Sequence, residues 1–430
     1  MDLNNVEFSW LNGSPKHWIK CKVKNKFRIV KDKTDSIEGY PILSLTMRGI
    51  VERDMSTNAG QLPDTYNGYA LLQLDDIVFN PMDLISGWVD KSKFIGLISP
   101  SYKVIRPISK DVQIDYYKYF FQRLYKEKVF FPFGEGVHYE YRWGLGTETL
   151  LNFPLLSPPL QEQEQIVIFL DDKTAKIDDL LAKTKKKIAL LKEKRSALIN
   201  HFVTKGLNPN APLKDSGVEW IGEIPSGWEL VRLNVLGEFS KGKGITKEKI
   251  KEKGYQCIRN GEIYTTYNRI SNEIISFIDE NTTKESVTVK KGALLFTGDG
   301  ETKEEIGKCL LYNGNETLYV GGGINIFTIT SAKVEATYLS FLMNSESVVY
   351  QKSRDGKGEI VVHIYSKQLR EIKFGLPPIE EQAQIVDYLD EQTSKIDTTI
   401  SKEEKRIALL KEYRQSLISN VVTGKIKVCN

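Results

Sequence analysis

The chain contains a long internal duplication. The 47 residues from 158 to 204 align without gaps on residues 377 to 423, at a constant offset of 219, and 26 of these pairs are identical. A shorter match lies upstream at an offset of 210, where Trp10, Pro15 and Trp18 correspond to Trp220, Pro225 and Trp228. Residues 30–155 and 240–373 show no similarity that can be aligned by eye. The duplication predicts two copies of one plan, each a globular segment followed by a helix.

Each repeated segment carries an apolar seam whose residues alternate between spacings of three and four over five heptads, which favours a coiled coil. The seam of the first segment consists of Val167, Leu170, Ile177, Leu181, Ile188, Leu191 and Leu198, and that of the second consists of Val386, Leu389, Ile396, Ile400, Ile407, Leu410 and Leu417. Homodimerisation and plain core packing also produce such seams. Two matching seams in one chain favour pairing with each other, and we expect an antiparallel pair.

Polar residues also occupy some equivalent seam positions, and four of them are expected to affect register. They are Thr184 and Glu403, and Arg195 and Arg414. Polar residues at seam positions lower the stability of a coiled coil while they fix its register. We therefore expect these residues to set how the two helices align.

The composition excludes several classes of protein. Apolar residues make up 40% and charged residues 27% of 430 residues, which is ordinary for a folded globular protein. The net charge of +4 is too weak to indicate nucleic-acid binding by itself. The four scattered cysteines lack the spacing of a metal site, and no window approaches 18 uninterrupted apolar residues. We expect reduced thiols, a cytoplasmic location and no membrane association.

No catalytic motif is apparent in the sequence. A phosphate-binding loop needs G-x-x-x-x-G-K-S/T, and Gly307-Lys308 lacks both the first glycine and the hydroxyl residue. An amino-methyltransferase run of Asp/Asn-Pro-Pro-Tyr is missing, and the four histidines lie far apart. We interpret Gly298-Asp299-Gly300 and Gly321-Gly322-Gly323 as turns. The sequence therefore predicts no catalytic residue, no metal site and no cofactor bound by this chain.

The repeated motifs resemble those of one known family, the specificity subunits of type I restriction-modification systems. The motifs that carry the resemblance are the helix entry L-P-P-x-x-E-Q-x-x-I at 376–385, with Ser157 in place of leucine at 157–166, the K-I-D runs at 176–178 and 395–397, the A-L-L-K-E-x-R runs at 189–195 and 408–414, and the opener W-I-G-E-I-P-x-x-W at 220–228, degraded at 10–18.

The resemblance implies an α+β protein with two mixed α/β target-recognition domains, separated by two long helices that pair as an antiparallel coiled coil with a pseudo-twofold repeat. We expect target-recognition domains at 1–157 and 220–376, helical regions at 158–204 and 377–423, a linker at 205–219 and a C-terminal tail at 424–430. Such a chain is non-catalytic, and each domain reads one half of a bipartite site in double-stranded DNA.

The resemblance also implies partner subunits and a ruler. The partners are two adenine-N6 methyltransferase subunits that use S-adenosylmethionine, and two restriction/translocase subunits that use ATP and Mg²⁺. At ~1.5 Å per residue the seam from Val167 to Phe202 is about 54 Å long. At ~3.4 Å per base pair, this length limits the separation of the two half-sites to roughly 15 base pairs.

Side chains that can reach base edges or phosphates gather in the segments that cannot be aligned. The first domain offers Arg48, Arg53, Tyr66, Asn67, Lys91, Lys93, His138, Tyr139, Tyr141 and Arg142. The second domain offers Lys241, Lys243, Arg259, Asn260, Tyr264, Tyr267, Arg269, Lys352, Arg354, Lys357, His363 and Tyr365. For any single residue of these groups, ordinary solvated surface is an alternative interpretation.

Two other functions stay open. A structural adaptor that uses its duplicated domains to bind proteins would show no salt-dependent affinity for DNA. A self-contained nuclease is the second alternative, and the missing catalytic motifs count against it.

Overall fold

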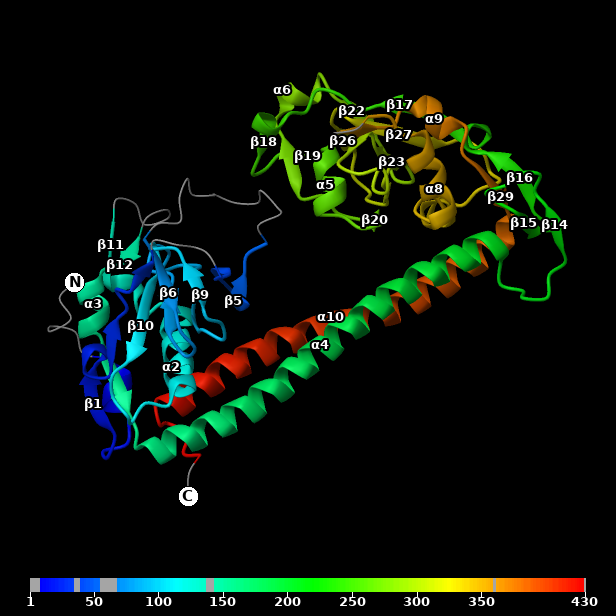
Figure 1. Cartoon of the computed structure of the whole chain (residues 1–430). Coiled ribbons are helices and arrows are strands. Elements are labelled where there is room, and N and C mark those ends of the chain that lie inside the picture. Colours follow the sequence, from blue (N-terminus) through cyan, green and yellow to red (C-terminus); the bar gives the residue numbers. More distant parts are fainter. Residues whose placement is uncertain (1–7, 35–38, 55–67, 137–142, 359–360, 429–430) are drawn as a thin grey trace. The chain divides into compact units, whose positions relative to one another are not determined.

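The computed structural model describes residues 8–34, 39–54, 68–136, 143–358 and 361–428. These residues form two compact units (Figure 1). Unit 1 comprises residues 1–185 and 405–430, and unit 2 comprises residues 186–404. Each unit therefore contains one globular domain and one half of each long helix. Along the described part of the chain, no helix combines the length and the apolar character that crossing a membrane requires.

The two long helices are α4 (Leu160–Lys205) and α10 (Ile379–Val422). Each begins directly after a Pro-Pro pair, where the fixed φ of proline suits the entry to a helix. The glycines that follow their ends, Gly206 and Gly424, adopt φ angles of 74° and 73°. This left-handed conformation is the usual way to end a helix and favours glycine.

In each unit the halves of α4 and α10 lie side by side in antiparallel directions (Figure 1). In unit 1, Arg414 forms a two-bond ion pair with Asp178, at 2.9 and 3.1 Å. In unit 2, Arg195 forms the same pair with Asp397, at 2.8 and 3.2 Å. The offset of 219 maps one pair onto the other, so the internal repeat extends from the helices to the side-chain contacts within each unit. The predicted antiparallel pairing is confirmed.

The seam residues are buried or half-buried along both helices. A further set of apolar residues is also buried near the helix ends, where each helix packs against a domain core, and the periodicity did not single these out. This set consists of the equivalent pairs Ile166 and Ile385, Ile199 and Ile418, and Val203 and Val422.

The first globular domain contains two sheets. The four-stranded sheet has the order β2 (Phe27–Ile29), β10 (Lys103–Pro107), β7 (Ile77–Phe79) and β8 (Val89–Lys91). The five-stranded sheet has the order β3 (Lys33–Thr34), β6 (Tyr69–Leu72), β9 (Gly96–Ile98), β4 (Ile42–Thr46) and β5 (Gly49–Glu52). The ladders β1 (Ile19–Lys22) with β13 (Pro154–Ser157) and β11 (Gly134–Glu135) with β12 (Gly144–Leu145) complete its strands, and its helices are α1 (Ser9–Asn12), α2 (Ile114–Lys126) and α3 (Thr147–Asn152).

The second globular domain also contains two sheets. One has the order β17 (Gly237–Lys241), β27 (Ile324–Ile329), β23 (Leu294–Thr297), β25 (Cys309–Tyr312) and β20 (Ile270–Ser271), and the other has the order β22 (Val287–Val289), β26 (Leu318–Val320), β19 (Tyr255–Ile258), β21 (Ser276–Ile278) and β18 (Ile250–Lys251). Short ladders join β16 (Glu229–Arg232) to β29 (Lys373–Leu376), β24 (Asp299–Gly300) to β28 (Val362–His363), and β14 (Leu213–Asp215) to β15 (Glu223–Pro225). The helices are α5 (Asn260–Thr265), α6 (Glu280–Thr283), α7 (Ala336–Met343), α8 (Glu346–Asp355) and α9 (Ser366–Arg370).

The two domains share one topology although their interiors cannot be aligned in sequence. The order β2-β10-β7-β8 corresponds to β17-β27-β23-β25, and β6-β9-β4-β5 corresponds to β22-β26-β19-β21. The parallel pair β4–β9 has its counterpart in the parallel pair β19–β26. Many apolar sequences satisfy the same buried strands, so the fold can persist while the residues change.

The segment expected to be a linker, residues 205–219, contains a strand. Within it, β14 pairs with β15 at the start of the second domain. The linker therefore contributes a strand to unit 2.

Candidate nucleic-acid interface

Equivalent hydrogen bonds join each domain to the long helix that follows it, and we call this joint the domain seat. Trp18 Nε1 donates to Glu162 at 3.0 Å, and Trp228 Nε1 donates to Glu381 at 3.0 Å. Both tryptophans are buried. These four residues belong to the repeated motifs, so the repeat encodes the joint between the domain and the helix.

A buried glutamine completes the seat in the first turn of each long helix. Gln163 donates to the carbonyls of Asp111 and Pro158, at 2.9 and 2.8 Å, and accepts from the N–H of Gln113 at 2.9 Å. In the other unit Gln382 makes the same three bonds, to Lys333, Pro377 and Glu335, at 2.8, 2.9 and 2.9 Å.

The first helix after each sheet also binds the end of a long helix. Tyr116 of α2 donates to the carbonyl of Val422 at 3.1 Å, and Tyr338 of α7 donates to the carbonyl of Val203 at 3.1 Å. Burial raises the pKa of both hydroxyls, so they stay protonated and act as donors.

One contact of the seat differs between the units. In unit 1 the hydroxyl of Tyr119 donates to Asp171 at 2.6 Å. The counterpart in unit 2 is Phe341, which has no hydroxyl. Arg269 lies over that phenyl ring, with its guanidinium carbon 3.4 Å from the centroid, and reaches Asp390 at 2.9 Å. A tyrosine in one domain and an arginine in the other therefore bind equivalent aspartates of the long helices.

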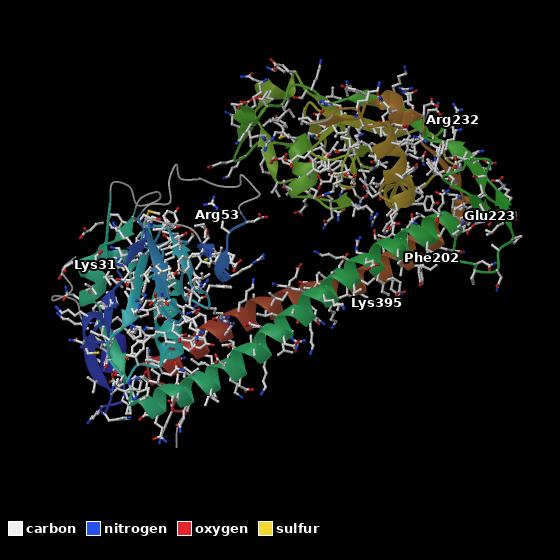
Figure 2. All side chains as sticks on the ribbon, viewed as in Figure 1. Lys31, Arg53, Phe202, Glu223, Arg232 and Lys395 are labelled. Atoms are coloured by element: carbon white, nitrogen blue, oxygen red, sulfur yellow. The ribbon has the colours of Figure 1, made fainter. Side chains whose placement is uncertain are left out.

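The described first-domain candidates lie near the hairpin of β4 and β5 and on β8. Arg48 is exposed in the β4–β5 turn, and Arg53 directly follows β5 (Figure 2). Lys93 is exposed after β8. Lys91 is only 18% exposed and pairs with Asp115 at 2.6 Å and Asp75 at 3.4 Å. Burial disfavours its charge, yet these two partners prevail and raise its pKa, so Lys91 is a fixed cation.

Six candidates of the first domain lie outside the described residues. They are Tyr66, Asn67, His138, Tyr139, Tyr141 and Arg142.

In the second domain the structure brings candidates from distant segments into one cluster, which we call the His363 cluster. It consists of Lys241, Asp299, Lys357, His363 and Tyr365. His363 Nδ1 lies 2.6 Å from Asp299 Oδ1, and the backbones of His363 and Lys357 exchange hydrogen bonds of 2.9 and 2.7 Å. The rings of His363 and Tyr365 stack, and the ammonium of Lys241 lies 5.3 Å from the Tyr365 centroid.

A neighbouring pair of candidates supports the cluster from α5. Asn260 Nδ2 and the Tyr264 hydroxyl both donate to the backbone carbonyl of Asp299, at 3.2 and 3.0 Å. This part of the domain combines positive charge with aromatic surface. The charge comes from the exposed Lys241, Lys243 and Lys357, and the aromatic surface comes from the half-exposed side chains of His363 and Tyr365. Such a combination suits phosphates and base edges. Sequence reasoning missed Asp299, which it assigned to a turn.

The remaining second-domain candidates make internal contacts. Lys352 is 1% exposed, donates to the carbonyls of Gly307 and Met343, and has its pKa lowered to about 8 by burial. Burial therefore removes Lys352 from any accessible surface. Tyr267 is also buried, and its hydroxyl accepts from the N–H of Ile275.

The candidate arginines of this domain are held by neighbours. Arg259 pairs with Glu262 at 3.1 Å, and Arg354 lies over the ring of Trp220 and binds Asp355. Arg269 belongs to the seat described above.

Within the described residues, no group of three or more His, Cys, Asp and Glu side chains could hold a metal ion. Burial raises the pKa of both Cys257 and Cys309 to about 12, so these thiols are unreactive at neutral pH.

Comparison with known proteins identifies a family whose profile matches most of the chain. The profile of the Type I restriction modification DNA specificity domain matches residues 21–190 and 225–411. Among curated relatives, the type I restriction enzyme MjaVIII specificity subunit of Methanocaldococcus jannaschii is 26% identical over 65% of this chain and 63% of its own length. The putative MjaX specificity subunit of the same organism is 23% identical over 96% of this chain and 95% of its own length.

Solved structures agree with this fold. A chain from a study of complex assembly and conformational transition of the type I R-M system matches with a TM-score of 0.74 at 14% identity, over 96% of this chain and 99% of that one. The HsdS subunit from Thermoanaerobacter tengcongensis matches with a TM-score of 0.54 at 14% identity, over 96% of this chain and 98% of that one.

Proposed function

Because the chain belongs to the family of type I restriction-modification DNA specificity subunits, we propose that each of its globular domains reads one half of a bipartite site in double-stranded DNA. The chain itself contributes recognition and no catalysis. The coiled coil sets the length of the unread spacer between the two half-sites.

One observation carries this proposal. The two domains share their topology and the hydrogen bonds that seat them on the helices, while their exposed side chains differ. In the second domain, Lys241, His363 and Tyr365 form a basic and aromatic cluster. The first domain instead exposes Arg48 in the β4–β5 turn and Lys93 after β8. Recognition of two different half-sites requires two domains that share a fold and its attachment to the helices but expose different side chains.

The long helices also offer equivalent positions for partner subunits. Leu190 and Leu409, related by the offset of 219, are 54% and 65% exposed. Exposed leucines at equivalent positions are suited to binding two copies of one partner. We assign them to two methyltransferase subunits, which bind S-adenosylmethionine, while two restriction/translocase subunits bind ATP and Mg²⁺.

Methylome sequencing tests the proposal. Cells that express the chain with its methyltransferase partner should carry a bipartite adenine-methylated motif. Replacing residues 20–155 with those of another specificity subunit should change one half of the motif and leave the other half intact.

The same experiment addresses the alternative of a protein-binding adaptor. An adaptor would leave the methylome unchanged when either domain is exchanged, and the purified chain with its partners would show no salt-dependent affinity for DNA. Either result would overturn the proposed function.

A further inference from the structure

The two domains contain crevices at equivalent places, where the ends of two neighbouring strands meet a later segment. In the second domain the crevice is lined by Lys241, Gly298, Asp299, Gly323, Ile324, Asn325, Ile364 and Tyr365. In the first domain it is lined by Pro81, Met82, Lys103, Glu135, Gly144, Leu145 and Gly146. We call these the Asn325 crevice and the Lys103 crevice.

Strand register shows that Lys103 and Asn325 are equivalent. In the first domain Lys103 lies opposite Phe79 in the β10–β7 ladder, and in the second domain Asn325 lies opposite Phe296 in the β27–β23 ladder. A further hydrogen bond confirms the match between the crevices, because the N–H of Leu145 donates to Pro81 as the N–H of Ile364 donates to Gly298, at 2.7 and 2.9 Å.

Asn325 lines its crevice and has a side-chain oxygen without a donor in the described part of the chain. The residue is 2% exposed, and its Nδ2 donates to the carbonyl of Ile364 at 3.1 Å, which fixes the orientation of the amide. Among the described residues, none donates to its Oδ1. A buried acceptor without a donor costs about 1 to 3 kcal/mol. The oxygen itself is shielded from solvent, so a ligand that brings a donor reaches it when the walls of the crevice shift slightly.

The size of the Asn325 crevice limits what can enter. Its volume is about 70 Å³, and a water-sized group occupies roughly 30 Å³. An amino group at the edge of a base fits, whereas a whole base does not. The crevice is narrow because Gly298 and Gly323 bring two backbones together: a Cβ on Gly298 would lie 2.5 Å from the carbonyl oxygen of Gly323.

The Lys103 crevice offers the opposite chemistry. Its volume is about 730 Å³, and it is wider since Gly144 and Gly146 stand where the second domain has His363 and Tyr365. One ammonium N–H of Lys103 donates to Thr147 at 2.6 Å. Burial lowers the pKa of Lys103, with Glu135 opposing that shift. The ammonium has three donors, so it can donate to a second acceptor in the crevice.

On the basis of the proposed function, we propose that the equivalent residues Lys103 and Asn325 each determine one base of the bipartite site. Asn325 accepts a hydrogen bond from an exocyclic amino group, and Lys103 donates to a keto oxygen. In the major groove, adenine and cytosine present amino groups, while guanine and thymine present keto oxygens. The half-site of the second domain therefore contains a position restricted to adenine or cytosine, and that of the first domain contains a position restricted to guanine or thymine.

The test is selection from randomised duplex DNA by the chain in complex with its methyltransferase subunits. Exchange of residues 20–155 assigns each half-site to its domain. We expect Asn325→Leu to relax one amino-bearing position of the second half-site by on the order of tenfold, and Lys103→Met to relax one keto-bearing position of the first by a similar factor.

Matched controls carry the same substitutions elsewhere. Asn313→Leu changes an exposed turn whose amide binds Asn272, and Lys333→Met removes an exposed ammonium paired with Glu229. Both should leave the two half-sites unchanged. The half-exposed Lys103 tolerates methionine sterically, so its half of the test does not depend on whether Asn325→Leu folds.

The outcomes separate the two proposals. If the unaltered complex selects no bipartite motif, the proposed function fails. If it selects a motif that the Lys103 and Asn325 variants leave unchanged, or weaken evenly at all positions, the proposed function stands and the assignment of these two residues is wrong.

Discussion

The buried glutamine in each domain seat gives the sharpest prediction for stability. Gln163 is fully buried and binds the carbonyls of Asp111 and Pro158 and the N–H of Gln113. Replacing it with leucine keeps the volume similar and removes all three bonds. The three backbone groups then lose these partners.

The magnitude follows from these bonds. At about 1 kcal/mol net for each hydrogen bond, the loss is about 3 kcal/mol, and it rises toward 5 kcal/mol where the abandoned groups gain no water. Gln382→Leu should cost the same in the second unit because its three bonds have equivalent partners and lengths. A loss of this size is a large fraction of the 5 to 15 kcal/mol that stabilises a typical domain.

Hydrogen exchange read by mass spectrometry can assign each loss to its unit, since local opening reports the stability of each region separately. We expect Gln163→Leu to speed exchange around residues 111–113 and Gln382→Leu around residues 333–335. The exposed neighbours Gln165 and Gln384, changed to leucine in the same helical turns, serve as matched controls and should have little effect. Losses below about 1 kcal/mol, or clearly unequal losses in the two units, would refute the reasoning.

Three further predictions concern other sites. Burial lowers the pKa of Lys352 to about 8, so between about pH 8 and 10.5 the unfolded chain holds more proton at this residue, and Lys352 by itself adds about 3 kcal/mol of stability as the pH rises. The raised thiol pKa of Cys257 and Cys309 acts in the opposite direction above about pH 9, so the measurement is the difference in unfolding free energy between the unaltered chain and Lys352→Met in denaturant titrations at several pH values; a difference that does not change with pH would contradict the prediction. Arg269→Met should destabilise unit 2 by about 1 to 2 kcal/mol, and adding Phe341→Tyr should recover part of this loss, because the other unit uses a tyrosine there; thermal unfolding measures both, and no recovery would count against the equivalence. Leu190→Glu and Leu409→Glu should each reduce co-purification of the methyltransferase subunit without changing the DNA motif of what remains; an altered motif would show that these leucines serve recognition instead.

Part of the seat was visible in the sequence. Glu162, Gln163, Glu381 and Gln382 are identical between the repeats, and the structure shows that all four bind the domains. The sequence could not show that the glutamines are buried, because glutamine in the first turn of a helix is usually exposed. Their repetition at a constant offset was the available signal.

The candidate interface was only partly accessible to sequence reasoning. Residue type pointed to Lys241, His363 and Tyr365, and the structure brings them together with Asp299. Residue type also pointed to Lys352, which is buried. A lysine in a charged segment has the same sequence signature whether its ammonium faces water or donates to buried carbonyls, so only the packing around it distinguishes the two cases.

The sequence by itself determined the paired helices, the repeat and the family. A heptad seam is a local pattern in which spacing alone sets the buried face, and a duplication at constant offset needs no structure to be recognised. The tertiary structure decided that two interiors without alignable sequence have one topology, and that Lys103 and Asn325 are equivalent. These facts depend on register between strands far apart in the chain, as when Asn325 lies opposite Phe296. Pairing between distant strands is fixed by the packing of the whole domain, and no local spacing encodes it.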